Sequence, residues 1–392
     1  MRVEELCSQL VKLKSENPPG DTKDVAEYIK NYLEEIGISC ITTDNPCGHT
    51  NVVSKNQNGK LLLSGHIDVV PAMDEGWNIP PYSGKIDDEY VYGRGSSDMK
   101  GGCAAVLLAA KRAADDGLTD NISLAFVCDE EGGGKYGTRY LINKKIIHPC
   151  DCLIAEPTPA LGPCIGQKGV LRFRVNFNGK PGHSSLHPAI GESAIIQAVD
   201  FLSSIIDYCS KDYPQTPQLE EIIKYSVKVA EKEYGGSDFS SILRRIMYNP
   251  GIISGGERVN IVAQKCHLDM DMRTPWGIEC KDVISDIKNL LPKTSEMILD
   301  TSSDASITSP DSFLVKTVCE AVGNVYNTEC HPMVQWAASD ARAMRCAGFN
   351  AIEYGPGVLG TIHGLNEKVS ISQLEKAVDI YYNIINKYSR CR

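Results

Sequence analysis

The order of strand-like and helix-like segments most limits how this chain can fold. Short, apolar, β-rich stretches alternate with amphipathic helical patterns near both ends of the 392-residue sequence. Such alternation is typical of an α/β sheet. We expect strands at 60–64, 122–128, 152–155 and 350–354, and helices at 3–14, 24–36, 100–116, 310–322 and 371–387.

The middle of the chain follows a different order. Its pattern predicts a strand at 169–178, a helix at 192–208, strands at 247–254 and 261–272, a helix at 281–291 and a strand at 296–301. This β-α-β-β-α-β order is that of a ferredoxin-like module. We therefore expect an inserted domain at 170–304 within a catalytic domain formed by 1–169 and 305–392. The polar stretch at 211–245 lies outside the minimal module, and the pattern assigns it no role.

Composition excludes several classes of protein. A formal net charge of -10 disfavours nucleic acid as the main partner, because the overall field repels phosphate. The longest apolar stretches, such as 103–110, are too short to span a bilayer, and residues 1–20 lack the apolar core of a signal peptide. The 15 cysteines are scattered and include no C-x-x-C pair, which is typical of reduced, buried thiols. We expect a soluble, cytoplasmic protein with no nucleic acid or membrane partner.

A histidine and an aspartate follow the first of the expected buried strands. His66 and Asp68 lie in the segment SGHIDVVP, where residues two apart on an extended chain point to one side. A metal-binding imidazole usually needs an acidic partner on its other nitrogen, so Asp68 is expected to orient His66. For this motif alone, a buried structural histidine bonded to aspartate is the alternative.

A glycine-rich turn, GRGSSDMKGG, brings Asp98 to the start of an apolar helix. Asp98 either caps this helix or serves as a ligand. The turn is not a dinucleotide fingerprint, because Asp98 replaces the last glycine of G-x-G-x-x-G. Ser97 and Lys100 match the S-x-x-K pattern of penicillin-binding enzymes. However, the segment SDA at 339–341 misses the S-D-N element and no K-T-G follows, which argues against a serine nucleophile.

Further acidic and imidazole side chains follow the other expected strands. Glu130 and Glu131 lie in DEEGGG, Glu156 lies in AEPT, and His363 lies in GTIHGLNE. Each residue alone has a structural alternative, such as a place in a solvated loop. Adjacent carboxylates repel one another unless cations compensate them, and open α/β sheets bind ligands at the carboxyl ends of their strands. We therefore expect these residues to gather at one edge of the sheet.

This set of residue types suits a pair of metal ions. Imidazole and carboxylate ligands without thiolate are typical of catalytic zinc, with cobalt or manganese as substitutes. Five ligands are too many for one catalytic zinc, which usually keeps three protein ligands. If one carboxylate bridges, five residues give each of two ions three ligands. The remaining glutamate is then free to act as a base, although the spacing does not say which glutamate this is.

In order, the HID, GRGSSDMKGG, DEEGG, AEPT and GxxHxxNE segments resemble the zinc aminoacylase and carboxypeptidase family. This family includes acetylornithine deacetylase, succinyl-diaminopimelate desuccinylase and carboxypeptidase G. The resemblance covers nearly the whole chain and implies a mixed-sheet, zinc-exopeptidase-like catalytic domain with an inserted ferredoxin-like domain. It also implies that Glu130 is the general base and that Asp68 contacts a metal ligand rather than a metal ion.

The same resemblance assigns the metal ligands. It implies that Asp98 bridges two zinc ions. His66 and Glu156 would complete one site, and Glu131 and His363 would complete the other.

The resemblance further implies that the inserted domain is a lid that mediates dimerisation. His183, in GKPGHSS, matches a histidine that reaches a neighbouring active site to stabilise the oxyanion, although a surface-turn histidine is the alternative. Arg273 matches an arginine that binds the substrate carboxylate, a task that suits its planar fork. It could instead pair with Asp269 or Asp271. Asn260 is expected to make a second polar contact with the substrate.

We therefore expect a homodimeric zinc enzyme that cleaves an amide bond in a small N-acyl amino acid. A dipeptidase or carboxypeptidase is the alternative within this chemistry. A noncatalytic ligand-binding homologue is the alternative from another class, and the presence of every expected ligand and of the base disfavours it. The acyl group, the amino-acid side chain and the physiological metal depend on pocket shape and metal supply, which the sequence does not specify.

Overall fold

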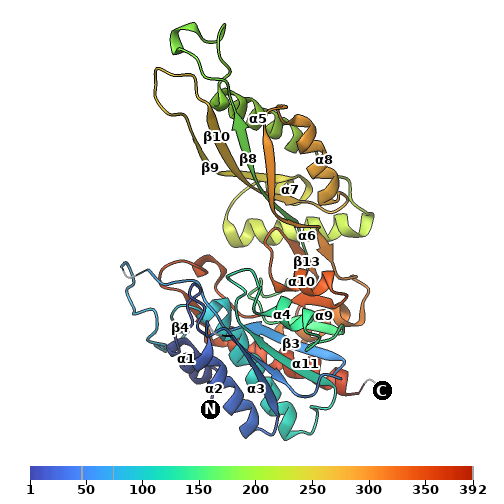
Figure 1. The fold of residues 1–392 in the computed structure, drawn as a ribbon. Helices are drawn as coiled ribbons and strands as arrows, with labels where there is room; N and C mark the ends of the chain where they lie inside the picture. Colours follow the sequence, from blue (N-terminus) through green and yellow to red (C-terminus); the bar gives the residue numbers. More distant parts are fainter. Residues whose placement is uncertain (46, 74, 391–392) are drawn as a thin grey trace.

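The computed structural model describes residues 1–45, 47–73 and 75–390. Two sheets dominate the fold, one in each of two domains that are stacked end to end (Figure 1). Within the described residues, the larger sheet has nine strands in the order β1-β2-β5-β3-β6-β14-β7-β12, with β13 beside β7. Its strands are β1 (Cys40–Asp44), β2 (Thr50–Ser54), β3 (Leu61–His66), β5 (Ile122–Val127), β6 (Asp151–Ile154), β7 (Cys164–Gln167), β12 (Ser306–Ile307), β13 (Met333–Gln335) and β14 (Asn350–Glu353).

The centre of this sheet is parallel. Strand β3 pairs in parallel with β5 and β6, and β6 pairs in parallel with β14. All residues of β3 and β5 are buried, which explains why these strands appear in the sequence as continuous apolar runs rather than alternating ones. The carboxyl ends of the parallel strands therefore meet at one edge, where the loops that follow them can build a site.

Helices cover the larger sheet. They are α1 (Val3–Lys12), α2 (Lys23–Glu35), α3 (Gly101–Asp115), α4 (Thr138–Asn143), α9 (Phe313–Tyr326), α10 (Asp340–Cys346) and α11 (Ile371–Ser389). Helix α3 is largely buried and packs against β3, α1 and α11. A short two-stranded sheet, β4 (Tyr90–Tyr92) with β15 (Lys368–Ser370), joins the glycine-rich turn to the C-terminal region.

The smaller sheet is antiparallel and has the order β11-β8-β10-β9. Its strands are β8 (Gly169–Asn178), β9 (Met247–Gly255), β10 (Lys265–Thr274) and β11 (Glu296–Ser303). Helices α5 (Ala194–Cys209) and α8 (Cys280–Leu290) pack on it and form a separate apolar core. Along the chain, these strands and helices follow the expected β-α-β-β-α-β order. Burial alternates along β8 and β10, as in strands that pack one face on a core.

The polar stretch at 211–245 folds into α6 (Pro217–Tyr234) and α7 (Phe239–Arg244). The expectation placed it in the inserted domain, but its buried apolar residues, including Ile223 and Leu243, join the core of the larger domain. The hydroxyl of Ser226 accepts a hydrogen bond from the Val334 amide at 2.9 Å, which fixes α6 beside β13. Helix α6 lies between the two sheets in Figure 1, so this segment ties the domains together.

Several short elements were not expected from the sequence, and each has too few residues to show a clear period. They include β1, β2, β7, β12, β13, α4 and α10. In the described part of the chain, no helix combines the length and apolarity needed to cross a membrane. The cysteines described there carry free thiols.

Candidate metal centre

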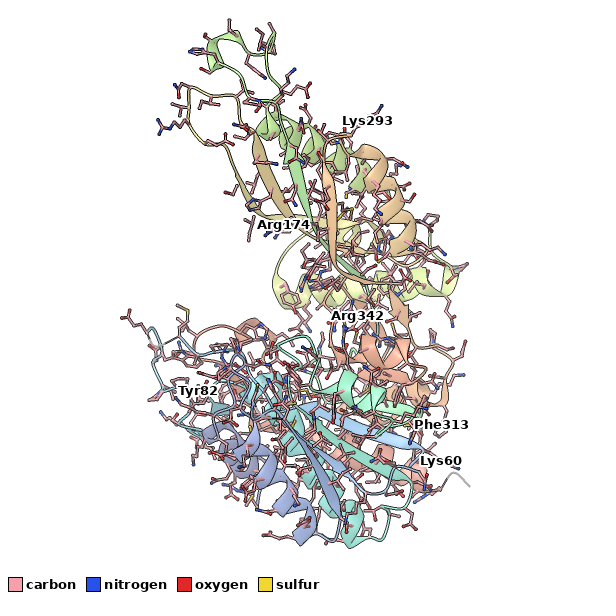
Figure 2. The ribbon with its side chains drawn as sticks, viewed as in Figure 1. Lys60, Tyr82, Arg174, Lys293, Phe313 and Arg342 are labelled. Carbon is pink, nitrogen blue, oxygen red and sulfur yellow. The ribbon has the colours of Figure 1, made fainter. Side chains whose placement is uncertain are left out.

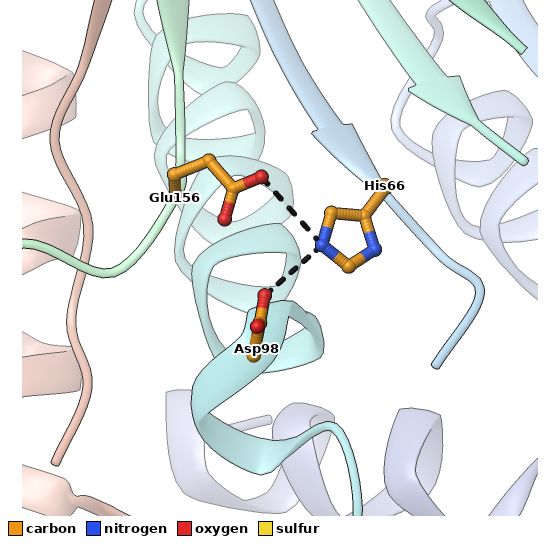
Figure 3. Close-up of side chains that lie close together, drawn as sticks. All are labelled: His66, Asp98 and Glu156. Carbon is orange, nitrogen blue, oxygen red and sulfur yellow. Dashed lines mark hydrogen bonds and ion pairs between the residues drawn. The ribbon is translucent and has the colours of Figure 1, made fainter. Parts of the chain in front are cut away.

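His66 is the last residue of β3 (Figure 3). Its side chain is buried. Its Nε2 lies 3.0 Å from Oδ1 of Asp98 and 3.6 Å from Oε1 of Glu156. Asp98 comes from the turn before α3, and Glu156 follows β6. Three separate segments thus bring one imidazole and two carboxylates to the edge predicted from the sequence.

The glycines after Asp98 allow this approach. A Cβ atom at Gly102 would lie 2.1 Å from the carbonyl oxygen of Ala155, the residue before Glu156. Only glycine fits where the start of α3 meets the end of β6. Asp98 lies within the short helical segment Ser96–Lys100, and the N-cap residue of α3 is Lys100, so the helix-cap alternative does not describe Asp98.

The second oxygen of Asp98 faces a different histidine. Nε2 of His363 lies 3.2 Å from Oδ2 of Asp98 and 3.1 Å from Oε1 of Glu131. Two groups of three donors therefore share Asp98: His66, Asp98 and Glu156 form one, and Asp98, Glu131 and His363 form the other. The ligand atoms within each group lie within 4.8 Å of one another. This arrangement of imidazole and carboxylate donors fits two divalent ions bridged by one carboxylate.

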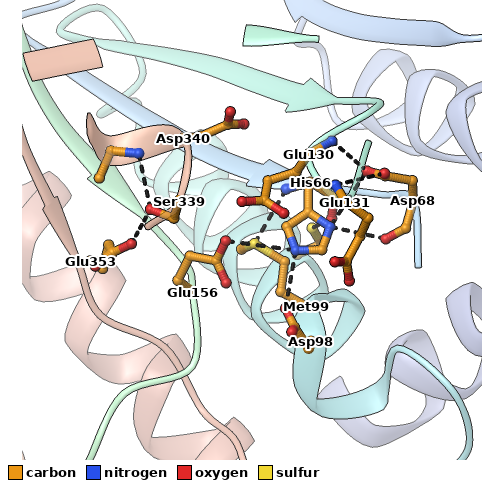
Figure 4. Close-up of polar contacts among 12 residues, drawn as sticks. His66, Asp68, Asp98, Met99, Glu130, Glu131, Glu156, Ser339, Asp340 and Glu353 are labelled. Atoms are coloured by element: carbon orange, nitrogen blue, oxygen red, sulfur yellow. Dashed lines mark hydrogen bonds and ion pairs between the residues drawn. The ribbon is translucent and has the colours of Figure 1, made fainter. Parts of the chain in front are cut away.

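Asp68 is the centre of a hydrogen-bond network beneath these groups (Figure 4). Its carboxylate accepts hydrogen bonds from the backbone amides of Glu130 and Glu131, each at 3.1 Å, and from Nδ2 of Asn17 at 2.9 Å. One carboxylate oxygen also lies 3.6 Å from Nδ1 of His66. Burial alone would raise the pKa of Asp68, but the contacts with His66, Asn17 and the backbone lower it. Asp68 therefore stays ionised and fixes both the first histidine and the acidic turn.

Of the adjacent glutamates Glu130 and Glu131, Glu131 belongs to a donor group, whereas Glu130 lies outside both groups found in the described chain. Burial raises the pKa of its carboxyl well above the ordinary value. The charge of His66 lowers this pKa, whereas the negative charge of Asp340 raises it. A carboxyl with a raised pKa is better matched to proton transfer near neutral pH. Glu130 also lines a cavity of about 600 Å³ between the two domains, where a substrate could reach it.

The centre carries an excess of negative charge. Burial raises the pKa of Glu156 well above its ordinary value, and the nearby charges of Asp98 and Glu130 raise it further. Hydrogen bonds to Asp98 and Glu131 raise the pKa of His363 to about 10. Carboxylates this crowded need nearby cations, and the two histidines are the only cationic groups in ion-pair contact with the donor carboxylates among the residues described. Divalent metal ions would supply that compensation.

The serine alternative does not match the side-chain contacts. The hydroxyl of Ser97 donates to the carbonyl of Lys368 at 2.7 Å, and Nζ of Lys100 donates to the carbonyl of Leu13 at 2.6 Å. Neither group has the other as its hydrogen-bond partner, so the pair required for a lysine-activated serine is not formed.

Two of the predicted substrate-site residues lie apart from this centre. His183 and Asn260 are exposed and neighbour each other, since the amide of Ser184 donates to the carbonyl of Asn260 at 3.2 Å. Their loops lie at the end of the smaller domain that points away from the larger sheet (Figure 1). Arg273 instead lines the cavity that contains Glu130, and its guanidinium pairs with Asp271 at 2.8 Å.

Two further supporting residues were not singled out from the sequence. Glu367 is fully buried, accepts hydrogen bonds from the amides of Ser97 and Asp98 at 3.0 and 3.1 Å, and pairs with Arg94 at 2.6 Å. Asn17 bridges Asp68 and Asp129. Glu367 belongs to the same GxxHxxNE segment as His363, so its position in a motif was the available signal. Nothing in the local sequence around Asn17 pointed to the site.

Comparison with known proteins gives consistent matches. The model of "Peptidase family M20/M25/M40" matches residues 62–387. A succinyl-diaminopimelate desuccinylase from Helicobacter hepaticus is 30% identical over 343 residues, covering 84% of this chain and 80% of that protein. An M20 family metallo-carboxypeptidase from Sulfolobus solfataricus has a TM-score of 0.81 at 22% identity, covering 99% of this chain and 100% of its own. A tripeptidase from Staphylococcus aureus has a TM-score of 0.76 at 20% identity, covering 99% and 98%.

The fold and these matches define the class of protein as a metallohydrolase with an α/β catalytic domain and a second domain built on a four-stranded antiparallel sheet. The chain belongs to peptidase family M20/M25/M40, since the family model spans residues 62–387. The family resemblance and the fold class predicted from the sequence are therefore confirmed.

Proposed function

We propose that this protein hydrolyses the amide bond of a small N-acyl amino acid, using two divalent metal ions with zinc as the favoured metal. The observation that carries the proposal is the position of Asp98, whose two oxygens face His66 and His363 at 3.0 and 3.2 Å. A relative that is 30% identical is named succinyl-diaminopimelate desuccinylase, which supports a substrate of this kind.

In this proposal, His66, Asp98 and Glu156 hold one ion, and Asp98, Glu131 and His363 hold the other. The bound ions would supply Lewis-acid activation of water and of the scissile carbonyl. Glu130 would take a proton from the attacking water and pass one to the leaving amine. Asp68 would hold the backbone of Glu130 in place through the hydrogen bond to its amide.

Arg273 is proposed to bind the substrate carboxylate. It lines the same cavity as Glu130 but comes from β10 of the smaller domain, so a substrate placed between them would contact both domains. The guanidinium is about three-quarters buried, and Asp271 occupies only part of its donor fork. A planar, partly desolvated guanidinium suits bidentate recognition of a carboxylate.

His183 and Asn260 would contribute from a second copy of the chain, since their loops lie far from the centre of their own subunit (Figure 1). Two features of the smaller domain support a homodimer. Strand β9 ends the sheet order and leaves one edge without a partner strand in the described chain. Apolar side chains are exposed on α5 and β9, namely Ile195, Ile196, Val199, Ile206, Ile252 and Ile253. Such edges and patches are typical of subunit interfaces.

The substrate class is tested by amine release from matched acetyl-amino acids, succinyl-amino acids and dipeptides, with zinc-loaded protein. Faster cleavage of the acylated compounds supports the proposal. Faster cleavage of dipeptides supports the dipeptidase or carboxypeptidase alternative, because these substrates carry a free α-amino group. Full metal loading without turnover of any compound would favour a noncatalytic homologue.

A further inference from the structure

The cavity beside Glu130 is lined by four arginines drawn from both domains. Arg139 comes from α4 and Arg342 from α10 of the larger domain, whereas Arg172 and Arg273 come from β8 and β10 of the smaller one. Arg342 lies at the junction of the domains in Figure 2. Acidic residues, including Asp300 and Asp340, line the same cavity, so the anion-binding capacity of each arginine depends on whether a carboxylate pairs with it.

The two arginines of the smaller domain share one counter-charge. Asp271 lies 2.7 Å from Nε of Arg172 and 2.8 Å from Nε of Arg273. Since Asp271 carries a single negative charge, it neutralises only one of these two guanidinium groups, and Asp300, which lines the same cavity, forms an ion pair with neither among the described residues.

The two arginines of the larger domain have no such partner. Neither Arg139 nor Arg342 forms an ion pair among the described residues, although the charge of Arg139 acts on the nearby Asp340, which also accepts a hydrogen bond from Thr138. Arg342 is only 8% exposed, and its Nη1 atom is buried without a hydrogen-bond partner. A buried guanidinium without a partner is costly, so it marks a place where an anionic group is expected to bind.

The backbone of Arg342 is anchored to a buried hydrogen-bond network. Its backbone amide donates to the carbonyl of Ser339 at 3.2 Å. The Ser339 hydroxyl in turn hydrogen bonds to the fully buried carboxylate of Glu353, which also accepts from Gln167 and Gln335 at 2.9 Å. A site with a fixed supporting network loses less entropy when its ligand binds.

We propose that the substrate carries a second carboxylate, which binds Arg342 with help from Arg139 while a first carboxylate binds Arg273. This proposal rests on the proposed amide hydrolysis and deepens it. The substrate class is an amide that joins an amino acid to a carboxylate-bearing partner. The second carboxylate could belong to a dicarboxylic acyl group or to an acidic amino-acid side chain, and both sources share the same chemistry toward Arg342.

The test compares N-acetyl-alanine, which has one carboxylate, with N-succinyl-alanine and N-acetyl-glutamate, which each have two. We expect kcat/KM for at least one of the last two to exceed that of N-acetyl-alanine by about 10-fold or more. The substitution Arg342→Gln should lower kcat/KM for that substrate by about 10- to 100-fold, mainly through KM, and change N-acetyl-alanine hydrolysis by less than about 3-fold. A loss confined to N-succinyl-alanine would assign the second carboxylate to the acyl group. A loss confined to N-acetyl-glutamate would assign it to the amino-acid side chain.

The matched control is Arg174→Gln, which removes an exposed arginine that is paired with Asp269 outside the cavity. It should leave both substrate classes unchanged. Equal losses for mono- and dicarboxylate substrates in Arg342→Gln would overturn the proposal, because they indicate a structural role. Equal kcat/KM for all three compounds in the parent protein would overturn it as well.

Binding separates this proposal from the proposed function. Calorimetric titration with succinate and glutarate, with acetate as the control, requires no turnover. Saturable dicarboxylate binding that Arg342→Gln weakens would support the anion site even if no amide is hydrolysed. Dicarboxylate binding no tighter than acetate binding, in a protein that does hydrolyse amides, would reject the second site and leave the proposed function intact.

Discussion

The carboxylate of Asp68 accepts a hydrogen bond from the backbone amide of Glu130 at 3.1 Å. The same carboxylate lies beside Nδ1 of His66, whose Nε2 faces Asp98 and Glu156. One buried group therefore fixes the position of the proposed base relative to the proposed metal ligands. This connection gives a physical reason for the acidic residue two positions after His66.

Replacing Glu130 with Gln should remove proton transfer while leaving the metal ligands in place. We expect kcat to fall by about 10²- to 10⁴-fold. The metal content, measured by plasma mass spectrometry, should equal that of the parent protein because Glu130 belongs to neither donor group. Full turnover in this variant would contradict the role of Glu130 as the base.

Replacing Asp98 with Ala should affect both metal ions, since this residue belongs to both donor groups. We expect fewer bound ions per chain than in the variant Glu156→Ala, in which only one group loses a ligand. Metal content of the purified variants measures the difference. If Asp98→Ala keeps two tightly bound ions, Asp98 does not bridge.

The metal-free protein should lose stability as the pH rises. The ordinary pKa of His363 is 6.5, and its hydrogen bonds to Asp98 and Glu131 raise the folded-state value to about 10. A folded-state pKa above the unfolded value contributes stability that is complete below pH 6.5 and lost as the pH rises through 10. Melting temperatures of chelator-treated protein should therefore fall across this window, and His363→Gln should flatten the decline. An equal decline in both proteins would count against this ion pair.

Glu367 should contribute strongly to stability because it is buried and paired with Arg94. Changing Glu367 to Gln leaves a buried guanidinium without its charge partner, which costs about 3 to 5 kcal/mol. Urea unfolding would measure this loss. The control Asp115→Asn breaks an exposed pair with Lys111 and should cost less than about 1 kcal/mol. A cost for Glu367→Gln as small as that of the control would show that the buried pair is not stabilising.

The sequence predicted the parts of the fold that have a strong local pattern. The strand that ends at His66 and the strand that precedes Glu156 are rich in apolar residues, and helix α3 has a long apolar stretch. These elements were expected within a few residues of their observed bounds. The short strands β12 and β13 depend on pairing with β7 rather than on their own sequence, so local patterns did not reveal them.

The candidate site was predicted less evenly. The five proposed ligands come together because the ends of parallel strands meet, which a strand pattern can anticipate. The partners of Asp68 and Arg342 depend on contacts between segments far apart in the chain. Asn17 lies 51 residues from Asp68, and Glu353 acts on Arg342 only through Ser339. The stretch at 211–245 was assigned no role from the sequence, because its polar composition concealed the apolar face of α6 that packs against the larger domain.

The most direct test of the account is a zinc titration of metal-stripped protein, followed by amine release from an N-acyl amino acid that the loaded enzyme cleaves. We predict that activity returns with zinc and reaches its plateau near two equivalents per chain, as expected if both donor groups are filled. Full activity in the stripped protein, or no activity with two ions bound across the substrate panel, would contradict a two-metal hydrolase.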